Sequence, residues 1–123
     1  MKRIVLHIGL PGDAGAQVAQ AFADSRAKLA TAGVVVPQGL GGTGHPLLHI
    51  AALDPARVDL VRARADYADP ARQSGLMEQV STEIAKAAEG CDALVLSCST
   101  LTSLHREEVA RLHRLLSPLA DRI

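Results

Sequence analysis

The stretch that decides the fold is RIVLHIGLPGDAGA, residues 3–16, which joins a hydrophobic run to a glycine-rich loop. The run Arg3–Ile8 is dominated by aliphatic and β-branched side chains, a pattern typical of a strand in a parallel sheet with both faces buried. The loop Gly9–Ala16 follows, and Gln17–Ala32 then shows helical spacing of apolar residues. A strand, a glycine-rich loop and a helix in this order predict a phosphate-binding loop, in which backbone N–H groups and a helix N-terminus surround an anion.

The side chains of this loop differ from those that phosphate chemistry requires. A working loop of this type normally carries a Lys followed by Ser or Thr, which hold the terminal phosphates and a metal ion. Residues 9–16 contain no Lys, Arg, Ser or Thr, and their one charged residue, Asp13, repels phosphate. The candidate cofactor-binding residues would therefore act through the backbone, and they are Gly9, Leu10, Pro11, Gly12, Asp13, Ala14, Gly15 and Ala16.

The rest of the sequence predicts a single α/β domain over residues 1–123. Short hydrophobic runs at Val34–Val36 and Ala93–Ser97 predict two further strands. Periodicity and start signals predict helices at Pro46–Ala52, Ala56–Ala68, Ala71–Glu89 and Arg106–Leu116. Because helices separate the strands, we expect parallel pairing and a three-layer sandwich around a short parallel sheet. The helix at Ala56–Ala68 is expected to turn Val58, Val61 and Ala65 inward.

Composition narrows the class of protein. The formal net charge is +0 and aromatic residues make up 2% of the 123 residues, which argues against nucleic-acid binding. Cys91 and Cys98 flank a predicted strand, roughly 20 Å apart when extended, so a disulfide is excluded and free thiols in a reducing cytoplasm are expected. No stretch is long enough to span a membrane, and no signal peptide is evident.

Several motifs together resemble the N-terminal part of bacterial sulfotransferase-family proteins. They are IVLHIGLP (residues 4–11), SRAKLATAGVVVP (25–37), HPLLHIAAL (45–53), DALVLSCSTL (92–101) and EEVARLHRLLSPLADRI (107–123). The resemblance covers nearly all of this chain and less than half of a typical family member. It implies a P-loop-like α/β fold, 3′-phosphoadenosine 5′-phosphosulfate as sulfuryl donor, and a small-molecule or carbohydrate acceptor. It also implies that the sheet is incomplete after Ile123, which would leave a strand edge open to self-association.

The chain departs from the family pattern at the groups that carry the chemistry. Gly9, Leu10 and Pro11 match the family loop, but Gly12 stands where the family has Lys. The family's Ser-Ser-Glu run after the third strand reads Ser97-Cys98-Ser99 here. The resemblance therefore predicts a catalytically impaired or inactive domain with at most weak nucleotide or anion binding, and leaves open whether the chain is an enzyme. The alternatives are a non-catalytic interaction domain or fragment, and a degenerate P-loop protein of the adenylate kinase type with Gly15 at the lysine position.

Other polar residues are weaker candidates. His7, Ser97 and Ser99 are the candidate catalytic side chains, because they lie at predicted strand ends beside the loop. His45 and His49 are four residues apart, as metal ligands on a helix would be, but no third ligand is near in sequence, so we expect a loop histidine, a surface histidine and no metal. Cys98 is expected to be a buried thiol rather than a nucleophile assisted by His105. The alternation of arginines with aspartates predicts a solvated face of mixed charge, comprising Arg57, Arg62, Arg64 and Arg72 with Asp59, Asp66 and Asp69.

Overall fold

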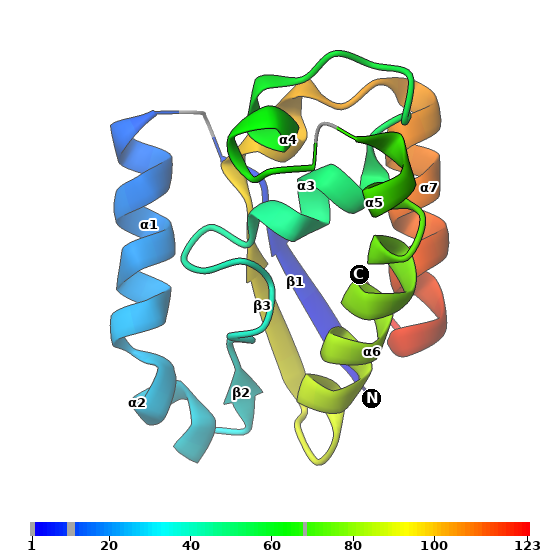
Figure 1. Ribbon diagram of the computed structural model, residues 1–123. Coiled ribbons are helices and arrows are strands. Elements are labelled where there is room, and N and C mark those ends of the chain that lie inside the picture. Colours follow the sequence, from blue (N-terminus) through cyan, green and yellow to red (C-terminus); the bar gives the residue numbers. More distant parts are fainter. Residues whose placement is uncertain (1, 10–11, 68) are drawn as a thin grey trace.

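Three parallel strands lie at the centre of the computed structural model, which describes residues 2–9, 12–67 and 69–123 (Figure 1). The strands are β1 (Arg3–His7), β2 (Val34–Val35) and β3 (Ala93–Ser97), and their order in the sheet is β1-β3-β2. Arg3 and Val34 are both in register with Ala93, and β3 therefore has a parallel neighbour on each side. The prediction of three parallel strands is confirmed, and the chain is a mixed α/β protein.

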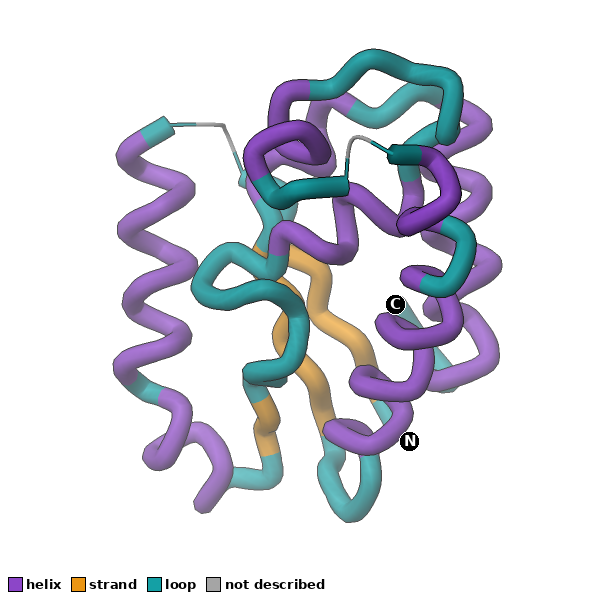
Figure 2. The backbone as a smooth tube through the Cα atoms, in the orientation of Figure 1, coloured by secondary structure: helices purple, strands orange, loops and turns teal. Residues whose placement is uncertain are grey.

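Helices cover both sides of this sheet. They are α1 (Asp13–Asp24), α2 (Arg26–Thr31), α3 (Pro46–Ala52), α4 (Leu60–Arg64), α5 (Pro70–Gln73), α6 (Leu76–Ala88) and α7 (Arg106–Leu116), with 3-10 turns η1 (Ser99–Ser103) and η2 (Ser117–Leu119). Figure 1 shows α1 and α2 on one side of the strands and α6 and α7 on the other. The tube in Figure 2 shows the segment between α3 and α6 beyond one end of the strands, whereas the loop between β2 and α3 runs beside them. The main core lies between β1, β3 and the helices α3, α6 and α7.

Two predicted helices are interrupted. The helix predicted at Gln17–Ala32 starts earlier and breaks at Ser25, which ends α1 and begins α2. The helix predicted at Ala71–Glu89 breaks at Gly75, because glycine has a low helix propensity. The break leaves the short α5 before it and the 13-residue α6 after it. Its buried face is formed by Leu76, Val80, Ile84 and Ala88.

The helix predicted at Ala56–Ala68 is too long, but two of its three inward positions, Val61 and Ala65, pack against the core as expected. Among the described residues of this range only the five of α4 are helical, and Val58 is 97% exposed instead of turned inward. The Asp54 side chain accepts a hydrogen bond from the Ala56 N–H, 2.9 Å away, so the expected helix start closes a local turn instead. The helix begins only after Asp59, whose side chain accepts from the Arg62 N–H.

The expectation that β1 is buried on both faces is also wrong. Ile4 faces the main core, but Val5 is 50% and Ile8 47% exposed. Successive side chains of a strand point to opposite faces, so Val5 and His7 lie on the face of the sheet away from the main core. On that face α1 packs mainly against β3, and the His7 ring contacts Phe22 of α1. β1 is thus an edge strand with a partly uncovered apolar face.

The C-terminal residues run along the outer side of β1. The Ile4 N–H donates to the Arg122 carbonyl at 2.8 Å, and Arg3 and Arg122 form an isolated parallel bridge. A shallow cleft of about 430 Å³ lies here, lined by Val5, Leu6 and Ile123 among others. The N–H groups of every second residue in a strand point to the same side, so the Leu6 N–H, like that of Ile4, points away from β3. The bridge to Arg122 forms at Arg3 and does not extend to Leu6.

This edge leads to a first prediction, that the 123-residue chain self-associates at micromolar concentration. An open strand edge beside apolar side chains is a template for pairing with another chain. Sedimentation velocity should show dimers or larger species, and Val5→Lys should shift the population toward monomer. Val58→Lys is the matched control, because Val58 is exposed on the distant segment before α4. A parent chain that sediments as a clean monomer, with fast exchange of the Leu6 amide, would contradict the prediction.

Candidate functional site

A cleft of about 390 Å³ opens where the segments after β1 and β3 meet. Its walls come from the first half of α1, the glycine-rich connector (residues 38–45), the start of α3, α4 and η1. Because these walls follow the carboxyl ends of parallel strands, the cleft occupies the place where open α/β sheets bind their ligands. Its polar side chains are Gln20, Thr43, Ser99 and Thr100, and none of the described residues that line it is charged. A ligand in this cleft therefore meets hydroxyl, amide and backbone groups.

The glycine loop leads directly into the helix beside this cleft. Gly12 has a φ of 108°, a conformation that favours glycine, and its carbonyl accepts from the Ala16 N–H at 3.1 Å. Gly15 is buried and lines the cleft with Ala16, whereas Asp13 and Ala14 are exposed. Gly9 lies so close to His7 that a Cβ would come within 2.8 Å of its Nε2 atom. Leu10 and Pro11 lie outside the described residues.

Two of the three candidate catalytic side chains are in contact. The Nδ1 atom of His7 lies 2.9 Å from the Ser97 hydroxyl oxygen, because both residues end paired strands in register. Ser97 is buried and does not line the cleft, so its hydroxyl satisfies His7 rather than facing a ligand. Ser99 is the candidate that lines the cleft. The structure therefore separates the pair of a buried Ser97 and a partly buried His7 from Ser99, which faces the cleft.

His45 lies in the loop before α3, as predicted, but its side chain is buried and holds structural contacts. Its Nε2 atom donates to the Pro37 carbonyl at 3.0 Å, and its Nδ1 atom accepts from the Ser97 N–H at 3.0 Å. This pair of contacts requires the neutral ring with its hydrogen on Nε2. Burial lowers the pKa of His45, against the opposing effect of the Pro37 hydrogen bond. His45 thereby ties the glycine-rich connector to the end of β3.

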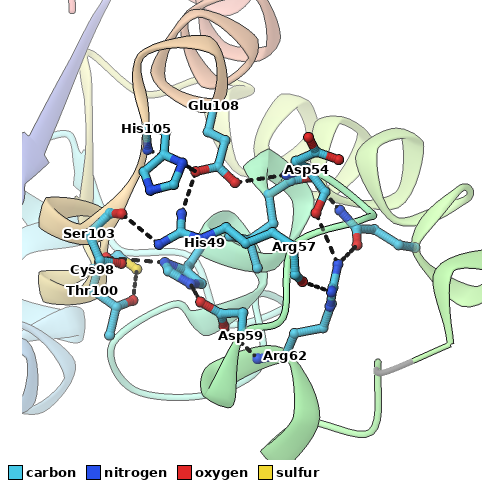
Figure 3. Close-up of polar contacts among 12 residues, drawn as sticks. His49, Asp54, Arg57, Asp59, Arg62, Cys98, Thr100, Ser103, His105 and Glu108 are labelled. Carbon is cyan, nitrogen blue, oxygen red and sulfur yellow. Dashed lines mark hydrogen bonds and ion pairs between the residues drawn. The ribbon is translucent and has the colours of Figure 1, made fainter.

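His49 is likewise buried, so its assignment as a surface histidine is wrong. Its side chain is fully enclosed, with Nδ1 3.1 Å from the Thr100 carbonyl oxygen and Nε2 3.1 Å from an Asp59 carboxylate oxygen (Figure 3). Each histidine is thus engaged by different partners. Within the described ranges, no three His, Cys, Asp or Glu residues are grouped as metal ligands would be. The sequence does contain a signal for this burial, because His49 is the lone polar residue in PLLHIAA.

The Cys98 thiol lies in a buried environment that disfavours the reactive thiolate. Its side chain is buried, its sulfur lies 3.4 Å from the Thr100 hydroxyl oxygen, and Cys91 is also free. Burial raises the pKa of Cys98, which opposes formation of a nucleophilic thiolate. His105 instead precedes α7, where its N–H donates to Glu108. The predicted burial of Cys98 is confirmed.

The expected solvated charged face is wrong for Arg57 and Arg62. Arg57 pairs with the buried carboxylate of Glu108 and also donates to the Ser103 carbonyl at 3.0 Å. Arg62 is only 5% exposed and donates to backbone carbonyls of the same segment (Figure 3). Arg64 and Arg72 lie on the surface as expected, and Arg72 pairs with the exposed Asp66 at 2.6 Å. The first two arginines therefore hold the segment between α3 and α6 in place.

Comparisons with known proteins do not assign this chain to a family. No family model matches the chain, and neither the curated proteins nor the solved structures include a significant match. Among the described helices, none has the length and apolar character needed to cross a bilayer.

Proposed function

We propose that this chain is a sulfotransferase-like P-loop domain that binds a nucleotide or another oxyanion weakly and does not transfer a sulfuryl group efficiently. The ligand would lie against the loop Gly9–Ala16 and in the cleft beside it. The donor that the family resemblance implies is 3′-phosphoadenosine 5′-phosphosulfate, and the acceptor would be a small molecule or a carbohydrate.

The main support is the position of the loop in the fold. It connects β1 to α1 at the carboxyl edge of a parallel sheet, and Gly12 takes the positive φ with which the chain enters the helix. Backbone N–H groups at such a helix start favour an anion, and the adjoining cleft offers room for the rest of a ligand. The hydroxyls of Thr43, Ser99 and Thr100 are suited to hydrogen bonds with phosphate or sugar oxygens.

The same site explains why we propose weak binding and poor transfer. Sulfuryl transfer places negative charge on the leaving group, and one donor aimed at that charge contributes about 3–4 kcal/mol to lowering the barrier. The described lining of the cleft offers no cation for this role, and Asp13 in the first turn of α1 opposes an anion. Anion binding would then rest on backbone amides and hydroxyls alone.

A second prediction tests this function by calorimetric titration with 3′-phosphoadenosine 5′-phosphate. Binding should be no tighter than about 100 μM, which corresponds to roughly 5–6 kcal/mol. Asp13→Lys should strengthen binding about three- to fivefold at low salt, because it replaces a repulsive charge at the helix N-terminus with an attractive one. The control is Asp24→Lys, which makes the same charge change at the other end of α1.

Either of two results would contradict the proposal. A low-micromolar dissociation constant for the parent chain would show that the loop does not need the missing lysine. Equal effects of Asp13→Lys and Asp24→Lys, with no amide shifts at residues 12–16, would place the anion elsewhere. Restoring lysine at position 12 is a poorer test, because the positive φ of Gly12 would be strained by any side chain.

A further inference from the structure

The feature that carries a further inference is the contact between His45 and the backbone of Ser97 at the end of β3. The Ser97 N–H is always a donor, and it lies 3.0 Å from Nδ1 of His45. The Pro37 carbonyl is always an acceptor, and it lies 3.0 Å from Nε2. Both contacts are therefore satisfied only by the neutral ring with its hydrogen on Nε2. His45 is 3% exposed, so water has little access to replace either partner.

We propose that His45 is an acid-sensitive latch, which holds the glycine-rich connector against β3 when neutral and releases it when Nδ1 takes up a proton. A hydrogen on Nδ1 points at the Ser97 N–H, so two donors face each other and the Ser97 N–H loses its acceptor. The contact with Pro37 survives protonation, but Pro37 immediately precedes the connector. That contact closes the loop on itself and does not tie it to β3. The protonated connector therefore moves away from Ser97.

The position of His45 explains how this release reaches the cleft. Thr43 and Gly44, directly before His45, line the cleft. Gly42 and Gly44 have φ values of 102° and 84°, and a Cβ at either position would meet nothing within 4 Å. Because side-chain packing does not hold this part of the connector, the contact of His45 with Ser97 fixes the wall. The effect of the latch on ligand binding rests on the proposed function, whereas the release itself does not.

Burial and charge keep the latch neutral at ordinary pH. Burial lowers the pKa of His45, against the opposing effect of the Pro37 hydrogen bond, and the positive charge of Arg26 in α2 lowers it further. Arg26 is held near the connector, because its Nε donates to the Val36 carbonyl at 2.9 Å. The connector itself contains no charged residue. The latch is therefore closed above the ordinary histidine pKa of about 6.5 and weakens as the pH falls below it.

The other ionisable groups around the connector are engaged elsewhere. His49 in α3 and His7 in β1 have partners of their own. The Glu83 carboxylate of α6 lies beside the other end of the connector, at residue 39. The part of α1 that lines the cleft is uncharged, and burial raises the pKa of the Cys98 thiol after β3, which keeps it neutral. The charge that acts on the latch is therefore that of Arg26, which opposes a second positive charge.

A third prediction tests the latch by NMR on the ¹⁵N-labelled chain without ligand. At about pH 7, the ring of His45 should carry its hydrogen on Nε2. Acidification by one pH unit favours release by up to about tenfold, so exchange of the Ser97 amide should accelerate up to about tenfold between about pH 7 and pH 5.5, after correction for intrinsic rates. The amide signals of Thr43 and Gly44 should shift over the same range. The Cys98 amide is the reference, because it donates to the His7 carbonyl at 3.0 Å.

His45→Gln separates the latch from a merely structural contact. Glutamine offers an N–H for the Pro37 carbonyl and an oxygen for the Ser97 N–H, and it does not titrate. The Ser97 amide of this variant should stay protected in mild acid, whereas His113→Gln, at an exposed histidine of α7, should keep the response of the parent. The latch is overturned if Ser97 exchange in the parent accelerates less than about twofold relative to Cys98. A hydrogen on Nδ1 at neutral pH, or a response that persists in His45→Gln, would overturn it too.

The effect of the latch on the ligand site is tested by titrating 3′-phosphoadenosine 5′-phosphate into the parent and into His45→Gln at both pH values. Comparing the two chains cancels the protonation of the ligand itself. Binding to the parent should weaken more on acidification than binding to the variant. Equal weakening would show that the latch does not control the cleft. If Ser97 responds as expected but neither chain binds the nucleotide at either pH, the proposed function fails and the latch stands.

Discussion

Replacing Glu108 with alanine should lower the free energy of unfolding by about 3 kcal/mol, a large share of the stability of a domain of this size. Glu108 is buried at the third position of α7 and accepts from the Asp54 N–H and the His105 N–H, both at 2.8 Å. It also pairs with Arg57. Removing the carboxylate leaves two backbone donors and one cation without their partner, which costs more than the loss of a single contact.

The measurement is urea denaturation of the parent and the variant. Glu107→Ala is the matched control, because Glu107 is the exposed neighbour in the same helical turn. Its expected effect is below about 0.5 kcal/mol. Similar midpoints for Glu107→Ala and Glu108→Ala would show that the buried carboxylate does not stabilise the fold.

Glu108 also gives stability a dependence on acid. Burial alone would raise the pKa of Glu108, but hydrogen bonds from the His105 and Asp54 N–H groups and the charge of Arg57 outweigh it, so the pKa is lowered. A carboxyl whose pKa is lower in the folded state stabilises the fold above its unfolded value, about 4.3, and loses that contribution as the pH falls through the folded value. The parent should therefore lose stability below about pH 4, and Glu108→Gln should lose less over the same range.

The sequence was most informative where one local pattern determined the outcome. Ala93–Ser97 was predicted with the observed bounds, because an uninterrupted apolar run can be accommodated in the central strand of a sheet. Burial of Cys98 followed from the same run. β1 has a similar pattern but lies at the edge, and Val5 remains half exposed. The hydrophobic pattern of a single strand does not predict whether that strand lies at the centre or at the edge of the sheet, because the strand order depends on how the helices pack.

The polar residues of the candidate site were harder to place, because their partners are distant in sequence. His49 meets Thr100 at a separation of 51 residues, and His45 meets the Ser97 N–H at 52. Arg62 was assigned to a solvated face because its neighbours alternate in charge. Its burial depends on carbonyl groups that become available only when the segment after α3 turns back on itself. The periodicity of neighbouring residues therefore cannot predict which distant backbone groups will contact a polar side chain.

Arg62 should be the most sensitive residue of that segment, and Arg62→Ala should cost about 3–5 kcal/mol. The two hydrogens of Nη1 are shared among the Asp54 and Pro55 carbonyls, at 3.2 and 3.1 Å, and the Gln73 side-chain oxygen, at 2.9 Å. Nη2 donates to the Arg57 carbonyl. Gln73 in turn donates to the Leu53 carbonyl at 2.6 Å, so the guanidinium connects both ends of the turn between α3 and α6.

The chemistry of this site should make substitution by another long side chain ineffective. The planar guanidinium of Arg62 donates to oxygen atoms that lie in several directions. The compact ammonium of Arg62→Lys cannot reach all of them. Arg62→Met fills similar space but leaves the buried oxygens without donors. Both variants should therefore fall closer to Arg62→Ala than to the parent. Arg64→Ala, two residues away on the exposed side of α4, should change stability by less than about 0.5 kcal/mol.

Urea denaturation combined with amide exchange can distinguish global from local loss of structure. If Arg62→Ala lies within about 1 kcal/mol of the parent and residues 54–64 keep their protection, the guanidinium does not organise the segment. If the segment alone loses protection, α4 opens without unfolding the core, since its five residues have too little helix propensity to stay ordered alone. In that case His49 cannot hold α4 by itself, because Asp59 contacts it from the same segment that Arg62 closes.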